Sequence, residues 1–166
     1  MTDGPTYVLD ADVFITAARS YYAFEVAPAF WEGLIRQATG GRVLSIDRVK
    51  DEIQRGKDDL VKWANGTFHP WFATTAQDDV IAAYRDIMRW AQAQSQFFDY
   101  AKDEFAQGAD GWLVAYAKAK GCVVVTNETF EPAIRRKIKI PNVCRAFGVP
   151  YSNTFQMLRA LGIKLG

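Results

Sequence analysis

Residues 7–12 read YVLDAD and residues 122–128 read CVVVTNE, and each stretch begins as an apolar run that favours a β-strand and ends in a carboxylate. Between them, a helical stretch over 112–120 opens at Asp110 and is followed by Gly121, a residue type that commonly ends helices. A helix of about ten residues advances roughly 15 Å, and a strand of about five residues returns roughly 17 Å. Asp110 and Glu128 are therefore expected to lie at the same end of the helix and strand. The sequence predicts an α/β fold with a central, mainly parallel sheet flanked by helices.

Four acidic side chains are expected to meet at one edge of this sheet. Asp10 and Glu128 follow two of the strands, Asp110 opens the helix before the second strand, and Glu52 lies in a helical segment over 47–55. In open parallel sheets, ligands bind beyond the carboxyl ends of the strands. Several carboxylates in one place repel one another unless they share protons or bind divalent cations. The pattern therefore predicts a metal site.

The residue types favour Mg²⁺ or Mn²⁺, because hard oxygen ligands suit these ions. Zinc is disfavoured, since His69 is the one histidine and Cys122 and Cys144 lack the spacing of zinc ligands. A divalent ion activates water and stabilises a leaving oxygen, so cleavage of a phosphodiester needs no histidine base. We read the two cysteines as buried free thiols.

The ordered motifs resemble those of PIN-domain ribonucleases. The resemblance rests on VLDADVFI at 8–15, VKDEI at 49–53, ADGWLVAYA at 109–117 and VVTNE at 124–128, which follow that family's order and spacing. It covers most of the chain. The tail, with KIPNVC at 139–144, is similar to a bacterial subgroup that includes VapC-like toxins of toxin–antitoxin pairs. The resemblance implies that residues 1–166 form a single PIN-like domain.

The resemblance also implies the roles of the acids. Asp10, Glu52 and Asp110 match the family's metal-binding positions, and Glu128 takes the fourth acidic place, where most members have aspartate. The implied activity is that of a metal-dependent endoribonuclease, which hydrolyses RNA phosphodiester bonds with Mg²⁺ or Mn²⁺ and leaves 5′-phosphate and 3′-hydroxyl ends. Ala11 departs from the family, which commonly has serine or threonine there.

Three neighbouring residues are candidates for supporting the acids. Asp12 adds a carboxylate near the metal ligands, and Thr126 and Asn127 are placed to orient those ligands through hydrogen bonds. Each acid also has a structural explanation. Asp12 and Asp110 stand where helix N-caps belong, and for Asp12 the cap is the favoured interpretation. Glu52, taken alone, reads as a solvated helix charge.

The charge pattern gives a weak signal for nucleic acid, because the formal net charge is only +1. One basic run follows the last acidic motif, and it consists of Arg135, Arg136, Lys137 and Lys139. We predict that this run holds the phosphate backbone of RNA; a solubilising surface patch is the alternative. The many aromatic residues are read as core or interface residues rather than as platforms for bases.

Resemblance to the toxin members implies a cognate antitoxin that covers the acidic pocket, and it is compatible with a homodimer. Two other functions stay open. One is a non-catalytic PIN-like binding module, suggested by Ala11 and by glutamate at position 128. The other is a haloacid-dehalogenase-like phosphatase with Asp10 as nucleophile and Asp12 as acid and base. The chain has VFI at 13–15 where that phosphatase family has a Gly-Thr pair, which argues against it.

Composition and helical periodicity complete the expectations. The chain is 49% hydrophobic and 23% charged, which is ordinary for a globular protein. Its start is polar and no apolar run is long enough for a bilayer, so we expect a cytoplasmic protein without membrane contact. A strand is predicted over 42–46. The longest helical region covers 78–106, with a break or bend predicted at 94–96.

Overall fold

The strands form one parallel sheet in the computed structural model, which describes residues 4–165. The sheet has the order β3-β2-β1-β4-β5, and all four neighbouring pairs are parallel. This confirms the predicted α/β class. The strands are β1 (Tyr7–Leu9), β2 (Val43–Ile46), β3 (Phe72–Ala73), β4 (Val123–Val125) and β5 (Tyr151–Ser152).

Helices connect the strands, as parallel pairing requires. The α-helices are α1 (Ala11–Thr16), α2 (Pro28–Thr39), α3 (Asp47–Ile53), α4 (Asp59–Gly66), α5 (Asp78–Ala93), α6 (Asp99–Gln107), α7 (Asp110–Lys120), α8 (Ile140–Phe147) and α9 (Thr154–Leu161). A π-helical turn, η1 (Ala17–Tyr21), extends α1, and a 3₁₀ turn, η2 (His69–Trp71), precedes β3. The break predicted at 94–96 is confirmed, because α5 ends at Ala93 and α6 begins at Asp99.

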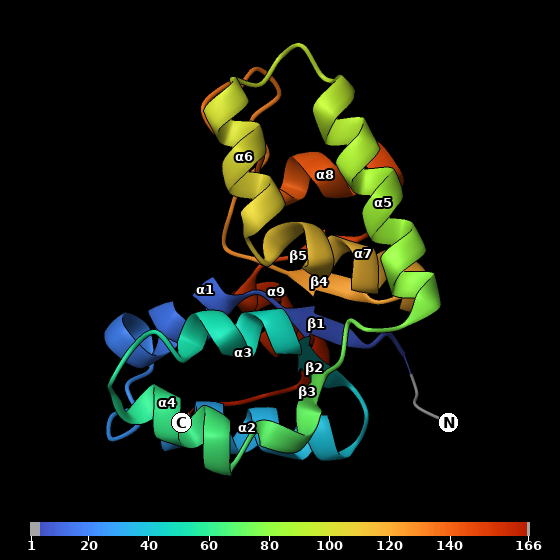
Figure 1. The fold of residues 1–166 in the computed structure, drawn as a ribbon. Helices are drawn as coiled ribbons and strands as arrows, with labels where there is room; N and C mark the ends of the chain where they lie inside the picture. Colours follow the sequence, from blue (N-terminus) through green and yellow to red (C-terminus); the bar gives the residue numbers. More distant parts are fainter. Residues whose placement is uncertain (1–3, 166) are drawn as a thin grey trace.

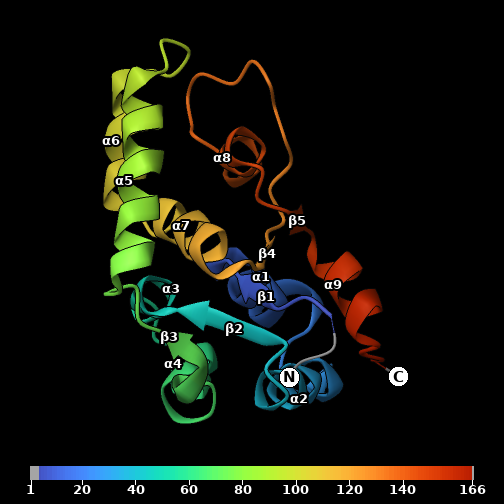
Figure 2. The same ribbon diagram turned by 90° about the vertical axis from the view of Figure 1, so that its right-hand side faces the viewer.

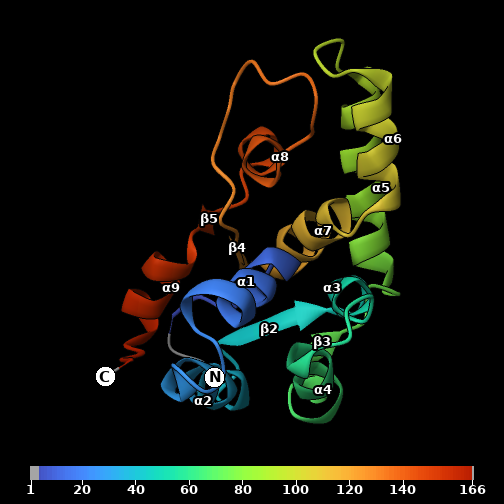
Figure 3. The same cartoon turned by 90° about the vertical axis from the view of Figure 1, so that its left-hand side faces the viewer.

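The elements divide along the sheet. Figure 1 shows the strands running from β5 at the top to β3 at the bottom, with the α5–α6 pair and α8 above and α2 and α4 below. In Figures 2 and 3, α9 and the α5–α6 pair lie on opposite sides of the strands. Within the described residues, 4–165, no helix is long and apolar enough to cross a bilayer.

The chain order creates a switch point at the middle of the sheet. From β1 the chain moves to β2 and β3 on one side, and it then returns to β4 and β5 on the other side. β1 and β4 are paired in register, with Leu9 opposite Val125. The residues that follow these two strands therefore emerge side by side at the position where open α/β sheets bind ligands.

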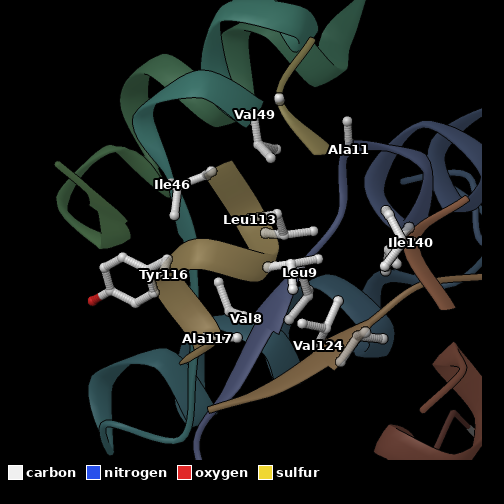
Figure 4. Packing of buried hydrophobic residues seen from close by; sticks show 14 of the residues in the cluster. Val8, Leu9, Ala11, Ile46, Val49, Leu113, Tyr116, Ala117, Val124 and Ile140 are labelled. Carbon is white, nitrogen blue, oxygen red and sulfur yellow. The ribbon is translucent and has the colours of Figure 1, made fainter. Parts of the chain in front are cut away.

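Apolar packing fixes α7 over this position. Figure 4 shows Leu113 of α7 beside Leu9 of β1, with Val124 of β4 and Ile140 of α8 close by, and all four are fully buried. Burying one such side chain contributes roughly 1.5 to 3 kcal/mol. The helix ends as predicted at Gly121, whose φ of 71° lies in the left-handed region that glycine adopts without strain. Because Leu113, near the start of α7, packs on Leu9 at the end of β1, the first residue of α7 lies near this edge of the sheet.

Candidate acidic site at the carboxyl edge of the sheet

Asp10 is a buried carboxylate that follows β1. Asp10 is 6% exposed, and its Oδ2 accepts a hydrogen bond of 3.1 Å from Thr126 Oγ1. Its backbone N–H donates to Val125 O at 3.0 Å, which continues the ladder between β1 and β4. Thr126 Oγ1 also accepts a 3.1 Å hydrogen bond from the Glu128 backbone N–H. One hydroxyl therefore links the ends of both strands.

Asp110 and Glu52 approach the same edge from two helices. Asp110 is the first residue of α7 and is partly buried. Glu52, in α3, accepts a hydrogen bond of 3.3 Å at its Oε1 from the Ala109 backbone N–H. This contact ties α3 to the start of α7, so Glu52 is not the freely solvated helix charge that its sequence neighbourhood suggests.

The acids are close enough to perturb one another. Burial raises the pKa of Asp10 well above the usual aspartate value, and the charges of Asp110 and Glu128 raise it further. Burial also raises the pKa of Asp110 to about 7, with Glu128 adding to the rise and Lys137 opposing it. Glu52 contributes to the Asp110 shift as well. The structure therefore brings together the four acids that the sequence placed at this edge.

Glu128 is held by two donors at the rim of the site. Its Oε1 accepts a 3.0 Å hydrogen bond from the Ile140 N–H at the start of α8, and its Oε2 accepts one of 2.5 Å from Lys137 Nζ. Burial alone would lower the pKa of Lys137, but the hydrogen bond and charge of Glu128 and the charges of Asp110 and Asp10 raise it on balance. Lys137 is thus a cation inside the acidic site. It lies in an irregular segment, where no periodicity predicts which way a side chain points.

The donor chemistry fits a hard divalent ion, whereas the side-chain positions do not yet form a binding shell. Carboxylate oxygens are the preferred ligands of Mg²⁺ and Mn²⁺, and the crowded charges need a counter-ion. Among residues 4–165, however, no three Asp, Glu, His or Cys side chains are arranged as a ready-made ion site. Glu52 and Glu128 each accept a hydrogen bond from a backbone N–H group.

The structural explanation of Asp12 and Asp110 as helix N-caps is wrong. α1 begins at Ala11, with Asp10 in the N-cap position, because the Asp10 carbonyl accepts from the Val13 N–H at 3.1 Å. Asp12 therefore lies within the first turn, exposed, and accepts a 3.0 Å hydrogen bond from Thr16 Oγ1. Asp110 likewise stands one residue after the N-cap of α7. Neither aspartate is explained by capping.

The Asn127 side chain bonds to α9 rather than to one of the acids. Its Oδ1 accepts a hydrogen bond of 2.9 Å from Thr154 Oγ1, the first residue of that helix. Its geometry therefore differs from that of Thr126, which bonds directly to Asp10. The sequence placed both residues beside the acids, but only the threonine contacts one.

The side chains of the predicted basic run have different partners. The Arg135 guanidinium lies 4.9 Å from the centre of the Phe98 ring, and Lys139 Nζ pairs with Glu131 Oε1 at 2.6 Å. Arg136 is exposed. Of the four residues, Lys137 is the one that contacts the acidic site. It also lines a pocket of about 230 Å³ together with Asp110.

Comparison with known proteins supports the fold. The chain is similar to FitAcB from Neisseria gonorrhoeae, known from its crystal structure, with a TM-score of 0.56 and 18% sequence identity over 90% of this chain and 99% of that chain. At this identity the likeness shows the fold alone, an α/β fold with a central parallel sheet flanked by helices, as the sequence predicted. No curated protein matches the sequence. A family model described as a domain of unknown function, DUF4411, matches residues 7–165. Since this match spans nearly the whole chain, the protein belongs to the DUF4411 family.

Proposed function

We propose that the protein is a metal-dependent endoribonuclease that hydrolyses RNA phosphodiester bonds with Mg²⁺ or Mn²⁺. One observation carries the proposal: acids from distant parts of the chain meet at the switch point of the sheet, where burial and mutual repulsion raise the pKa values of Asp10 and Asp110. A group of buried like charges is costly unless a cation joins it. Strongly perturbed acids in such a position are typical of functional sites.

In this proposal Asp10, Glu52, Asp110 and Glu128 hold the ion. When bound, the ion supplies water activation and charge neutralisation at the phosphate. Thr126 fixes the orientation of Asp10 through its hydroxyl. The other residues of the site position these acids and set their charge.

The basic side chains nearest the acids would bind the phosphates of RNA. Lys137 contacts Glu128 at the rim of the site, and Arg136 is exposed one residue away. Arg135 and Lys139 have partners on the protein, Phe98 and Glu131, and belong to the outer part of the predicted run.

We further propose that the protein acts as the toxin of a toxin–antitoxin pair. The motif resemblance supports this, and the fold likeness agrees with it. A cognate antitoxin would then cover the acidic pocket. A homodimer is compatible with this proposal. Copurification of the protein with the product of its neighbouring gene, tested by size-exclusion chromatography, checks both expectations.

The decisive experiment is RNA cleavage with added Mn²⁺, compared between wild type, Asp10→Asn and Asp110→Asn. Asp103→Asn is the matched control, because Asp103 is exposed on α6. We expect cleavage that requires the metal, yields 5′-phosphate ends and is lost in both site variants but kept in the control. Cleavage that is equal in wild type and Asp10→Asn would contradict the proposal.

A non-catalytic PIN-like binding module is the second candidate. It is favoured by Glu128, both of whose oxygens are bound within the protein, and by the lack of a ready-made ion site among residues 4–165. Calorimetric titration with Mn²⁺ separates the two functions. A folded protein that takes up no Mn²⁺ and cleaves no RNA supports the binding module.

A further inference from the structure

A pocket of about 310 Å³ adjoins the acidic site on the side of α1 and α9. Its volume is at the lower end of the range for small-molecule sites, so it fits one flat group rather than a folded partner. Asp12 and Asn127 join the two places, because both line the pocket and they stand two residues after Asp10 and directly before Glu128 in the chain. A ligand with its charged part at the acids would therefore have its next group at this pocket.

Two large aromatic side chains stand at the pocket and face solvent. Tyr21 is 66% exposed and Phe155 is 56% exposed, although both are apolar enough to favour burial. Tyr21 ends the π-helical turn η1, a rare form that is frequent at functional sites. Phe155 is the second residue of α9. The two rings come from opposite ends of the sequence and line one hollow.

The inner wall of the pocket is fixed. Tyr22 also lines it, and its ring is stacked on Phe30 with 4.7 Å between ring centroids. The Tyr22 carbonyl accepts a hydrogen bond of 2.6 Å from Trp31 Nε1. A ring held in this way gives a flat ligand a rigid surface, whereas the two exposed rings can adjust around it.

Polar groups around the pocket have the chemistry that reads base edges. Asn127 and Asn153 line it, and each uses its amide oxygen within the protein, to accept from Thr154 Oγ1 and from the Gln156 N–H respectively. Each asparagine keeps its NH₂ group as a donor for a ligand. Asp12 supplies carboxylate acceptors. Donors and acceptors beside aromatic rings are the means by which proteins bind unstacked bases of single-stranded RNA.

We propose that this pocket, lined by Tyr21, Tyr22 and Phe155, binds one unstacked nucleobase of single-stranded RNA next to the phosphate at the acids. The inference rests on the proposed function for its substrate class. It adds a base subsite to a site that otherwise contacts only phosphates. It also assigns an RNA contact to aromatic residues. From the sequence, these residues were predicted to lie in the core or at an interface.

The test measures binding of a short, labelled, single-stranded RNA by fluorescence anisotropy, in EDTA and again in Ca²⁺. Tyr21→Ala and Phe155→Ala are compared with Tyr100→Ala, a control on α6 that is 55% exposed. Stacking of one base predicts a loss of roughly 5-fold to 100-fold in affinity for each site variant. The salt dependence should stay unchanged, because no phosphate contact is removed. Tyr21→Phe keeps the ring and should retain binding.

The same RNA with one abasic position per molecule provides the second arm, with the gap moved along the strand. At one position the wild type should bind as weakly as Tyr21→Ala, and the variant should lose nothing further. Equal affinities of wild type, Tyr21→Ala and Phe155→Ala overturn the pocket, and so does a wild type that binds no RNA. Loss of self-association in place of RNA binding assigns the surface to a protein contact and also overturns it.

These outcomes separate the pocket from the proposed catalysis. Base-dependent binding without Mn²⁺-dependent cleavage leaves the pocket standing and removes the nuclease. Cleavage with equal kcat and KM in wild type and Tyr21→Ala leaves the nuclease standing and removes the pocket.

Discussion

Replacing Asp110 by asparagine is expected to stabilise the protein in EDTA at pH 8. Asparagine keeps nearly the same shape but cannot ionise, so it removes a charge that burial and Glu128 penalise. The folded carboxyl has a pKa of about 7, against an ordinary value of 3.8. At a pH between these two pKa values, the folded state binds more protons than the unfolded state. The stability of the wild type therefore falls as pH rises through this window, and the loss is complete above pH 7.

The size of the effect follows from the same two pKa values. A difference of about 3 between folded and unfolded pKa corresponds to about 4 kcal/mol at a pH above both. The substitution also removes the attraction between Asp110 and Lys137, which opposes the shift. We therefore expect a gain of about 2 to 4 kcal/mol at pH 8, which raises Tm by about 5 to 15 °C in a chain of this length.

Urea denaturation followed by circular dichroism at pH 5, 6, 7 and 8 measures this gain. The difference between Asp110→Asn and wild type should be largest at pH 8 and should shrink toward pH 5, where the wild-type carboxyl is already protonated. The exposed control Asp103→Asn should show no such trend. If Asp110→Asn is no more stable than wild type at pH 8, or if its gain is the same at every pH, the acids do not form a repulsive cluster.

Three further predictions test individual contacts in the fold. Thr126→Val removes the hydroxyl that donates to Asp10, so it should cost about 1 to 3 kcal/mol in urea denaturation, with Thr126→Ser close to wild type. Gly33→Ala would place a Cβ 2.7 Å from Ile163 Cγ2, so a loss of about 1 to 3 kcal/mol is expected, and it should disappear in an Ile163→Ala background. Burial raises the pKa of the Cys144 thiol to about 12, so this thiol should stay unreactive toward a disulfide reagent until the protein unfolds; fast modification of the native protein would contradict its burial.

The sheet could be predicted from sequence because its signals are local. β1 and β4 are short apolar runs, and each is followed directly by a polar residue, Asp10 or Thr126. Gly121 ends α7 with a left-handed φ that few other residues adopt, so its role is fixed by its own chemistry. Since parallel strands share one direction, residues that follow them share one edge. The convergence of Asp10 and Glu128 follows from that rule, whereas Asp110, which opens α7, was placed with them by comparing the lengths of the helix and the strand.

The directions of the side chains could not be predicted in the same way. Glu128 follows β4, but the partner that holds it, Lys137, lies in an irregular segment nine residues later and is positioned by long-range packing. Asn127 stands next to Thr126 in the sequence and was given the same predicted role. Its side chain nevertheless bonds to α9, which the chain reaches only after β5. Contacts of this kind depend on where separate elements dock. Periodicity carries no information about them.

Two unfavourable placements of side chains occur near the same edge of the sheet. One is a buried charged group, and the other is a pair of exposed apolar groups. Asp10 is a charged group where burial is costly, and Tyr21 and Phe155 are apolar groups where exposure is costly. Conflicts that persist in a consistent fold mark functional sites. A cation alone would relieve the first conflict and an apolar partner alone the second. A nucleotide with its cation has a charged part and a flat apolar part joined by a short linker. It would relieve both at once, since Asp12 lines the pocket and stands two residues after Asp10.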